Sequence, residues 1–187
     1  MKKAILFIAL QLGAAACAVA QGTITSFGNL GLPGSVVYGG SFTPATGYVV
    51  ALLWAPGSSL VAQGSLTQIT TYGPAGTTAT PGKFSDPSVV TTGTGTSNGA
   101  VAVFDVQGWV GNYANYAAAV AGGALVGQTA EFFNGTGNPT PPATPPVNMT
   151  SWDGNLILVP SPEPSTIALG GIGAAVFWIW RRKNEDR

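Results

Sequence analysis

The sequence contains no histidine, and its one cysteine, Cys17, lies within the first twenty residues. A serine nucleophile needs a neighbouring base such as His or Lys, and a zinc site needs His or thiolate ligands. Between residues 21 and 160 only Lys83 can act as such a base, and no thiol is present to bind a metal or to form a disulfide. Composition therefore argues against a hydrolytic triad and a zinc enzyme, and we expect a protein without enzymatic activity or cofactor.

Charge is equally scarce, because Asp, Glu, Lys and Arg make up 7% of the chain against about 25% in ordinary globular proteins. Between residues 21 and 160 the single base stands against four acids, Asp86, Asp105, Glu131 and Asp153, so this part carries a net charge of −3. A nucleic-acid binder needs a basic surface to neutralise phosphates. We therefore expect no nucleic-acid partner.

The first residues have the pattern of a secretory signal. Lys2-Lys3 is followed by the apolar stretch Ala4 to Leu12, and Ala18-Val19-Ala20 forms a small-residue cleavage site before Gln21. This pattern predicts export through the Sec translocon and removal of residues 1–20 by signal peptidase. Two alternatives stay open: a lipoprotein that uses Cys17, and an N-terminal core helix.

The last residues predict a membrane anchor. Residues 165–180 are uncharged and mostly apolar, and Arg181-Arg182-Lys183 follow at once as a stop. Sixteen helical residues span about 24 Å, short for a hydrocarbon core of about 30 Å, so a buried globular helix is the alternative. Trp178 and Trp180 next to three bases are typical of a membrane interface, and the bases place the tail in the cytoplasm and the body outside.

The segment before this anchor carries a motif. Pro162-Glu163-Pro164, then an apolar helix that contains glycines, then Arg181-Arg182-Lys183 closely resembles the PEP-CTERM sorting domain. The resemblance implies that an exosortase-like membrane transpeptidase cuts the tail near the motif and passes the body to the cell surface or an extracellular matrix, in bacteria that make exopolysaccharide, biofilm or flocs. From the residues alone, a stiff juxtamembrane linker is the alternative, because the prolines hold the chain extended.

The body also resembles, more loosely, small PEP-CTERM proteins of Verrucomicrobia-like bacteria. The shared features are Gln21 to Ile24, Gly47 to Trp54, Tyr116 to Val120 and Leu158 to Pro160. This second resemblance implies no particular activity.

Between the two ends the sequence predicts a mainly β body. Short runs rich in Val, Ile, Thr, Tyr and Phe alternate with Gly- and Pro-rich turns, which favours a small β-sandwich or jelly-roll-like fold. Residues 48–54 form an almost continuous apolar run, typical of a strand covered on both faces. We expect strands at 23–27, 48–54, 60–63, 66–72, 88–92, 100–109, 129–133 and 156–159, and one short helix at 113–121.

Few residues of the body are candidates for chemistry. Asp105 and Glu131 formally allow the paired carboxylates of a glycosidase, but we expect acids on strands to face the solvent. Asp86, Asp105 or Asp153 with loop carbonyls is an alternative calcium site, although no EF-hand loop is present. The tryptophans and tyrosines either fill the core or include a platform that stacks against sugars.

We therefore expect a signal peptide at 1–20, a β-rich extracytoplasmic body at 21–159, and a sorting tail at 160–187 with its motif at 162–164, a transmembrane helix at 165–180 and a basic cytoplasmic end at 181–187. The expected location is the inner membrane with the body outside, then the cell surface or matrix after tail processing. The expected role is structural or adhesive, linked to exopolysaccharide or biofilm. The alternative is a carbohydrate-binding module delivered by the same route.

Overall fold

The computed structural model describes residues 21–161, except 78, 94–95, 97–98, 140–141 and 153. The predicted signal peptide at 1–20 and the predicted tail from residue 162 onwards lie outside the described residues. Within the described part of the chain, no helix is both long enough and apolar enough to cross a membrane.

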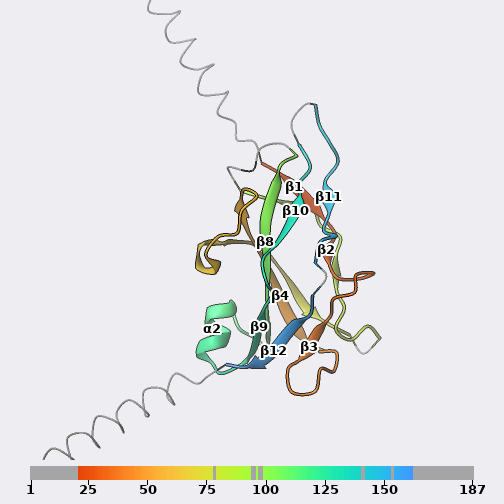
Figure 1. The fold of residues 1–187 in the computed structure, drawn as a ribbon. Coiled ribbons are helices and arrows are strands. Elements are labelled where there is room, and N and C mark those ends of the chain that lie inside the picture. The colour runs from red at the N-terminus through yellow and green to blue at the C-terminus, as the bar shows by residue number, and fades with distance from the viewer. Residues whose placement is uncertain are drawn as a thin grey trace, which may run out of the picture.

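One large mixed sheet dominates the body and curls into a half-barrel (Figure 1). Its strands run in the order β3-β12-β9-β8-β4-β5, and β10 pairs with β8 beyond the end of β9. The bounds are β3 Val36–Tyr38, β4 Tyr48–Pro56, β5 Thr67–Ala75, β8 Val101–Val110, β9 Leu125–Gln128, β10 Phe132–Gly135 and β12 Leu156–Pro160.

Two small sheets and two short helices complete the body. One small sheet has the order β11-β1-β7, and the other pairs β2 with β6. The bounds are β1 Thr23–Thr25, β2 Phe27–Gly28, β6 Ser85–Asp86, β7 Val90–Thr91, β11 Val147–Asn148, the 3₁₀ helix η1 Gln63–Ser65 and the α-helix α2 Tyr116–Ala121.

The two small sheets close over one face of the large sheet, which we call the inner face. Alternate residues of β4 and β8 point to this face because successive side chains of a strand alternate sides. Tyr48, Leu52 and Phe104 are completely buried here, and Ile24 from β1 and Phe27 from β2 pack onto them from the small sheets. This face forms the main hydrophobic core.

The opposite face, which we call the outer face, has a smaller core. Ala51 and Leu53 from β4 and Val103 and Trp109 from β8 are buried on it. They are covered by α2 and by residues 57–66, the loop that contains η1, which we call the η1 loop. Strand β4 is therefore buried on both faces, as its continuous apolar run predicted.

The prediction of a mainly β body is confirmed, but the arrangement differs from two facing sheets of similar size. The large sheet contains most of the strands. Because it curls, the two small sheets are enough to close the core on its inner face. The predicted strand at 60–63 is wrong, because this segment forms part of the η1 loop. The predicted strand at 129–133 is also wrong as a unit, because the chain leaves the sheet between β9 and β10. Strands β3, β6, β9 and β11 were not predicted.

Candidate functional site

The body stays folded up to the residue before the predicted sorting motif. Strand β12 is an interior strand of the large sheet, paired in parallel with β3 and antiparallel with β9. Pro160 pairs with Leu125, and the Ser161 amide then donates to the Ala124 carbonyl at 3.0 Å. Ser161 is only 6% exposed. The described chain is therefore held in the sheet up to Ser161, two residues beyond the predicted strand end at 159.

Two glycines permit the close packing of β12. A Cβ atom at Gly127 on β9 would overlap the Ile157 carbonyl oxygen, so only glycine fits there. On the other side of β12, the Gly39 amide donates to the Leu158 carbonyl at 2.8 Å. A Cβ atom at Gly39 would lie 2.5 Å from Val159 Cγ1. Backbone therefore holds the exit strand on both sides.

Most of the predicted site residues lie outside the described residues: Ala18 and Ala20 of the signal cleavage site, Pro162, Glu163 and Pro164 of the motif, and Arg181, Arg182 and Lys183 of the membrane stop. Gln21 is described, is partly buried, and lines a groove beside Trp54. The described residues thus run from Gln21 to Ser161, and the domain limits and the two processing sites stay predictions.

Asp105 does not face the solvent, contrary to our expectation. It lies on the outer face of β8 and is completely buried. Thr129 Oγ1 donates to Asp105 Oδ1 at 2.7 Å, and Gln128 Nε2 donates to Oδ2. Burial raises the pKa of the Asp105 carboxyl, and these hydrogen bonds oppose the shift only in part.

The chain itself contained a signal for this burial. On a half-exposed strand the outward positions are polar, but the face that carries Asp105 and Gln107 also carries Val103 before them and Trp109 after them. An acid between large apolar residues on both faces of a strand indicates a face that is covered. The residues that cover this face of β8 come from α2 and the η1 loop, outside the strand itself.

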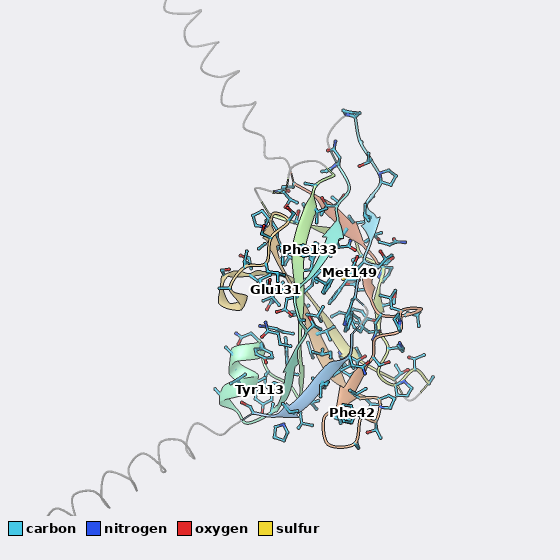
Figure 2. The ribbon with its side chains drawn as sticks, in the orientation of Figure 1. Phe42, Tyr113, Glu131, Phe133 and Met149 are labelled. Carbon is cyan, nitrogen blue, oxygen red and sulfur yellow. The ribbon has the colours of Figure 1, made fainter. Side chains whose placement is uncertain are left out.

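Glu131 lies near Asp105, on the side of the sheet that carries the η1 loop and α2 (Figure 2). Its Oε2 accepts a hydrogen bond from the Val61 amide at 3.0 Å, so it ties the η1 loop to the sheet. Its charge adds to the rise in the pKa of Asp105. Asp105 also contributes, after burial, to a raised pKa of the Tyr116 hydroxyl on α2.

This pair is a poor glycosidase site. A glycosidase needs both carboxyl groups open to a sugar between them, whereas Asp105 is buried and both of its oxygens accept hydrogen bonds from the protein. Glu131 Oε1 is also buried and has no hydrogen-bond partner. The arrangement supports a structural role, in which the two carboxylates join β8, β9 and the η1 loop.

Of the other two candidate calcium ligands, Asp153 lies outside the described residues and Asp86 lies in one of the small sheets. Asp86 is on β6, where its Oδ1 accepts from the Ser88 amide at 3.0 Å. The Lys83 ammonium donates to the carbonyls of Leu32 at 2.8 Å and Gly34 at 2.7 Å. Among the described residues, no group of three or more His, Cys, Asp or Glu side chains is placed to hold a metal ion.

The described tryptophans of the body belong to the core. Trp54, Trp109 and Trp152 are exposed by 5%, 1% and 2%. Trp152 packs against Phe84 with ring centroids 5.6 Å apart, and Trp109 meets Tyr116 edge-on at 6.5 Å. The core interpretation is confirmed for these residues, because none of them presents a ring face on which a sugar can stack.

One groove has the polar lining expected of a sugar site. It has a volume of about 590 Å³ and is lined by Gln21, Trp54, Thr67, Gln68, Thr91 and Thr92, among others. Hydroxyl and amide groups thus surround the edge of a buried indole, whose Nε1 has no hydrogen-bond partner.

The comparisons with known proteins match the end of the chain. The family model of the PEP-CTERM protein-sorting motif matches residues 162–183. No curated protein and no solved structure matches the chain. The matched residues begin immediately after Ser161, the last residue that the structure describes. The chain therefore carries a C-terminal PEP-CTERM protein-sorting motif, which implies an exported protein that exosortase processes and sorts to the cell surface.

Proposed function

We propose that this chain is a non-enzymatic protein of the cell envelope or extracellular matrix, with a structural or adhesive role linked to exopolysaccharide or biofilm. Signal peptidase removes residues 1–20 during export through the Sec translocon. The apolar segment 165–180 then anchors the body on the outside of the inner membrane until exosortase cuts near Pro162-Glu163-Pro164. The observation that carries this proposal is the sorting motif, which begins directly after Ser161, a residue bonded to the β body through its backbone.

The architecture of the body supports a role in which stability and presentation matter more than chemistry. The described acids and the described lysine form hydrogen bonds with the backbone or with other side chains of the body. Long sheet pairing and a core on both faces of the sheet resist local opening. Such a body suits a surface component that survives outside the cell without disulfides.

Mass spectrometry of the native C-terminus, combined with cell fractionation, tests the sorting step. In cells with active exosortase we expect the mature protein to lack residues 181–187 and to occur at the surface or in the matrix. In cells without exosortase we expect the full tail and an inner-membrane location. Retention of the tail in every mature copy would leave a plain membrane anchor and reject exosortase processing.

A matched pair of tail variants tests whether exosortase recognises the acid of the motif. Glu163→Ala removes the only charge of the motif, and we expect uncut protein to accumulate in the membrane. Glu185→Ala removes an acid of the same type beyond the family match and is expected to be processed normally. Equal processing of both variants would show that the acid of the motif is not recognised.

The groove beside Trp54 favours the second candidate, a carbohydrate-binding module with the same delivery. Its threonine and glutamine side chains supply donors and acceptors for sugar hydroxyls. A glycan array probed with the body, with Gln68→Ala as the groove variant, tests this function. We expect at least a tenfold loss of binding for Gln68→Ala and none for Thr71→Ala, which changes an exposed residue of the same strand outside the groove. Absence of binding to any polysaccharide would reject this candidate and leave the structural role.

A further inference from the structure

We propose that the end of the body from which the tail emerges docks on the lipid headgroups, with Phe42, Ile157 and Val159 as its contact residues. We call these three residues the exit patch. This inference rests on the proposed membrane anchoring of residues 165–180, and it adds an orientation and a second membrane contact. The exit patch is proposed to contact the outer surface of the same bilayer that holds the anchor.

The short connection brings the body to the membrane. Ser161 is fixed to Ala124 by a backbone hydrogen bond, and the predicted span begins at Ser165. Four extended residues cover at most about 14 Å. The headgroup region outside the hydrocarbon core is itself about 5–8 Å thick. The part of the body around Ser161 therefore lies at or just above the headgroups for as long as the anchor stays in the bilayer.

The exit patch lies at this end of the body. Ile157 and Val159 point to the side of β12 opposite the core residues Leu156 and Leu158, and they are 37% and 46% exposed. A Cβ atom at Gly39 would touch both Val159 and Ile157, which places the loop of residues 39–43 directly beside them. Phe42 on this loop is 62% exposed, and Figure 2 shows it at the end of the molecule near β12.

Phe42 is held outward by its loop. The Tyr38 amide donates to the Thr43 carbonyl at 3.0 Å, and the Phe42 amide donates to the Tyr38 carbonyl at 2.8 Å. These bonds close a tight loop in which Phe42 adopts a left-handed backbone with φ of 52°, a conformation that is unfavourable for a bulky residue. The ring thus projects from a fixed backbone, so little conformational entropy is lost when it inserts among lipids.

The surroundings of the exit patch suit a bilayer interface. Segments 36–48, 110–125 and 156–161 contain no Asp, Glu, Lys or Arg. Segment 75–83, which is hydrogen-bonded to residues 36–47, adds one cation, Lys83, whose ammonium donates to the Leu32 and Gly34 carbonyls. Aromatic and aliphatic side chains partition favourably into the interface, and no acid of these segments repels anionic lipids. Because the anchor already holds the body at the surface, the high effective concentration lets even a weak contact form.

Depth-dependent fluorescence quenching tests the docking on the full chain. With Cys17→Ser as background the protein has no other thiol, so single cysteines can carry an environment-sensitive fluorophore. We compare Phe42→Cys and Val159→Cys with Val89→Cys, each in vesicles of phosphatidylethanolamine and phosphatidylglycerol that carry a headgroup-region quencher. Val89 is a matched control because it is 58% exposed, and its neighbour Val90 pairs with β1 near the opposite end of the body (Figure 1).

We expect the vesicle-bound protein to show at least threefold stronger quenching at positions 42 and 159 than at position 89. Equal quenching at all three positions, or none at 42 and 159, in protein that floats with the vesicles would overturn the docking and leave the anchor intact. Failure of the full chain to float with the vesicles would reject the anchor and the docking with it.

Discussion

The two faces of the large sheet are both buried, but by different means. The inner face is closed by the two small sheets and packs Tyr48, Phe104 and Trp152 in an apolar cluster, and Asp86 on β6 is bonded to the Ser88 amide. The outer face is closed by α2 and the η1 loop, and it contains the buried carboxyl of Asp105 and the partly buried Glu131. The inner face therefore supplies most of the apolar stability, whereas the outer face depends on polar ties between elements.

This difference shows how a chain with few charges uses them. A buried carboxylate is costly unless hydrogen bonds satisfy it. Asp105 is satisfied by Gln128 and Thr129, and the Thr129 hydroxyl also accepts from the Val106 amide at 3.0 Å. These bonds secure the point where β9 ends and the chain leaves the sheet before β10. The outer face thus uses polar groups where the sheet is interrupted.

The largest expected effect is on the inner face. Trp152→Ala removes a 2% exposed indole that packs against Phe84, and we expect the free energy of unfolding to fall by about 3–5 kcal/mol. Urea denaturation followed by circular dichroism measures this loss. Val89→Ala, at a 58% exposed position, is the control and should change stability by less than about 0.5 kcal/mol. A loss as small as that of the control would mean that the inner face is not the main core.

The outer face is expected to make stability depend on pH through Asp105. Its pKa is raised in the folded protein, so the native state keeps a proton that the unfolded state releases. The contribution of Asp105 is therefore full below its unfolded pKa of about 3.9, and it is lost as the pH rises through the folded value.

Asp105→Asn isolates this contribution, because Gln128 can turn its amide to satisfy the new side chain. Relative to the wild type, we expect the variant to gain stability as the pH rises from about 4 to 8. Thermal unfolding at several pH values measures the difference. Parallel pH profiles of the two proteins would show that Asp105 has no raised pKa.

A smaller effect is expected where Glu131 ties the η1 loop to the sheet. Glu131→Ala removes the acceptor for the Val61 amide, and we expect a loss of about 1–2 kcal/mol with faster hydrogen exchange in the η1 loop. Glu131→Gln keeps an acceptor oxygen at the same place and should retain most of the protection. Unchanged exchange in Glu131→Ala would mean that apolar contacts alone hold the loop.

The smallest effect is expected at the start of α2, which covers the same face. Asn115 caps this helix, since its Oδ1 accepts from the Ala118 amide at 2.8 Å. Asn115→Ala should cost about 0.5–1 kcal/mol, and Asn115→Asp, which keeps the cap, should cost less. Chemical denaturation of the three proteins side by side measures the difference. Equal losses for Ala and Asp would show that the cap contributes nothing.

The sequence predicted the long strands, because their own residues show a clear apolar or alternating pattern. Residues 48–54 and 100–109 became β4 and β8, and the helix at 113–121 appears as the shorter α2. Strands β3, β6 and β11 have only two or three residues, too few for a period to be recognised. They exist because distant partners pair with them, as β12 does with β3.

The same reason explains the errors at the candidate sites. The sorting motif lies in consecutive residues, so the sequence was enough to find it, and the family match supports it. The burial of Asp105 depends on the η1 loop and α2. The η1 loop is far from Asp105 along the chain, and α2 follows β8 after a turn. The alternation of residues along a strand does not show whether other parts of the chain cover its outward face.

The sequence by itself determined the mainly β character of the body, the absence of histidine and of a thiol beyond residue 20, and the sorting motif at 162–183. Composition and short motifs are local properties, which need no knowledge of what lies nearby in space. Only the tertiary structure decided that one sheet curls into a half-barrel, that both of its faces are buried, and that β12 is held on both sides up to Ser161. Those features arise from pairings between residues distant in sequence, from Pro160 with Leu125 to Val36 with Leu156, and such pairings are selected by the packing of the whole body.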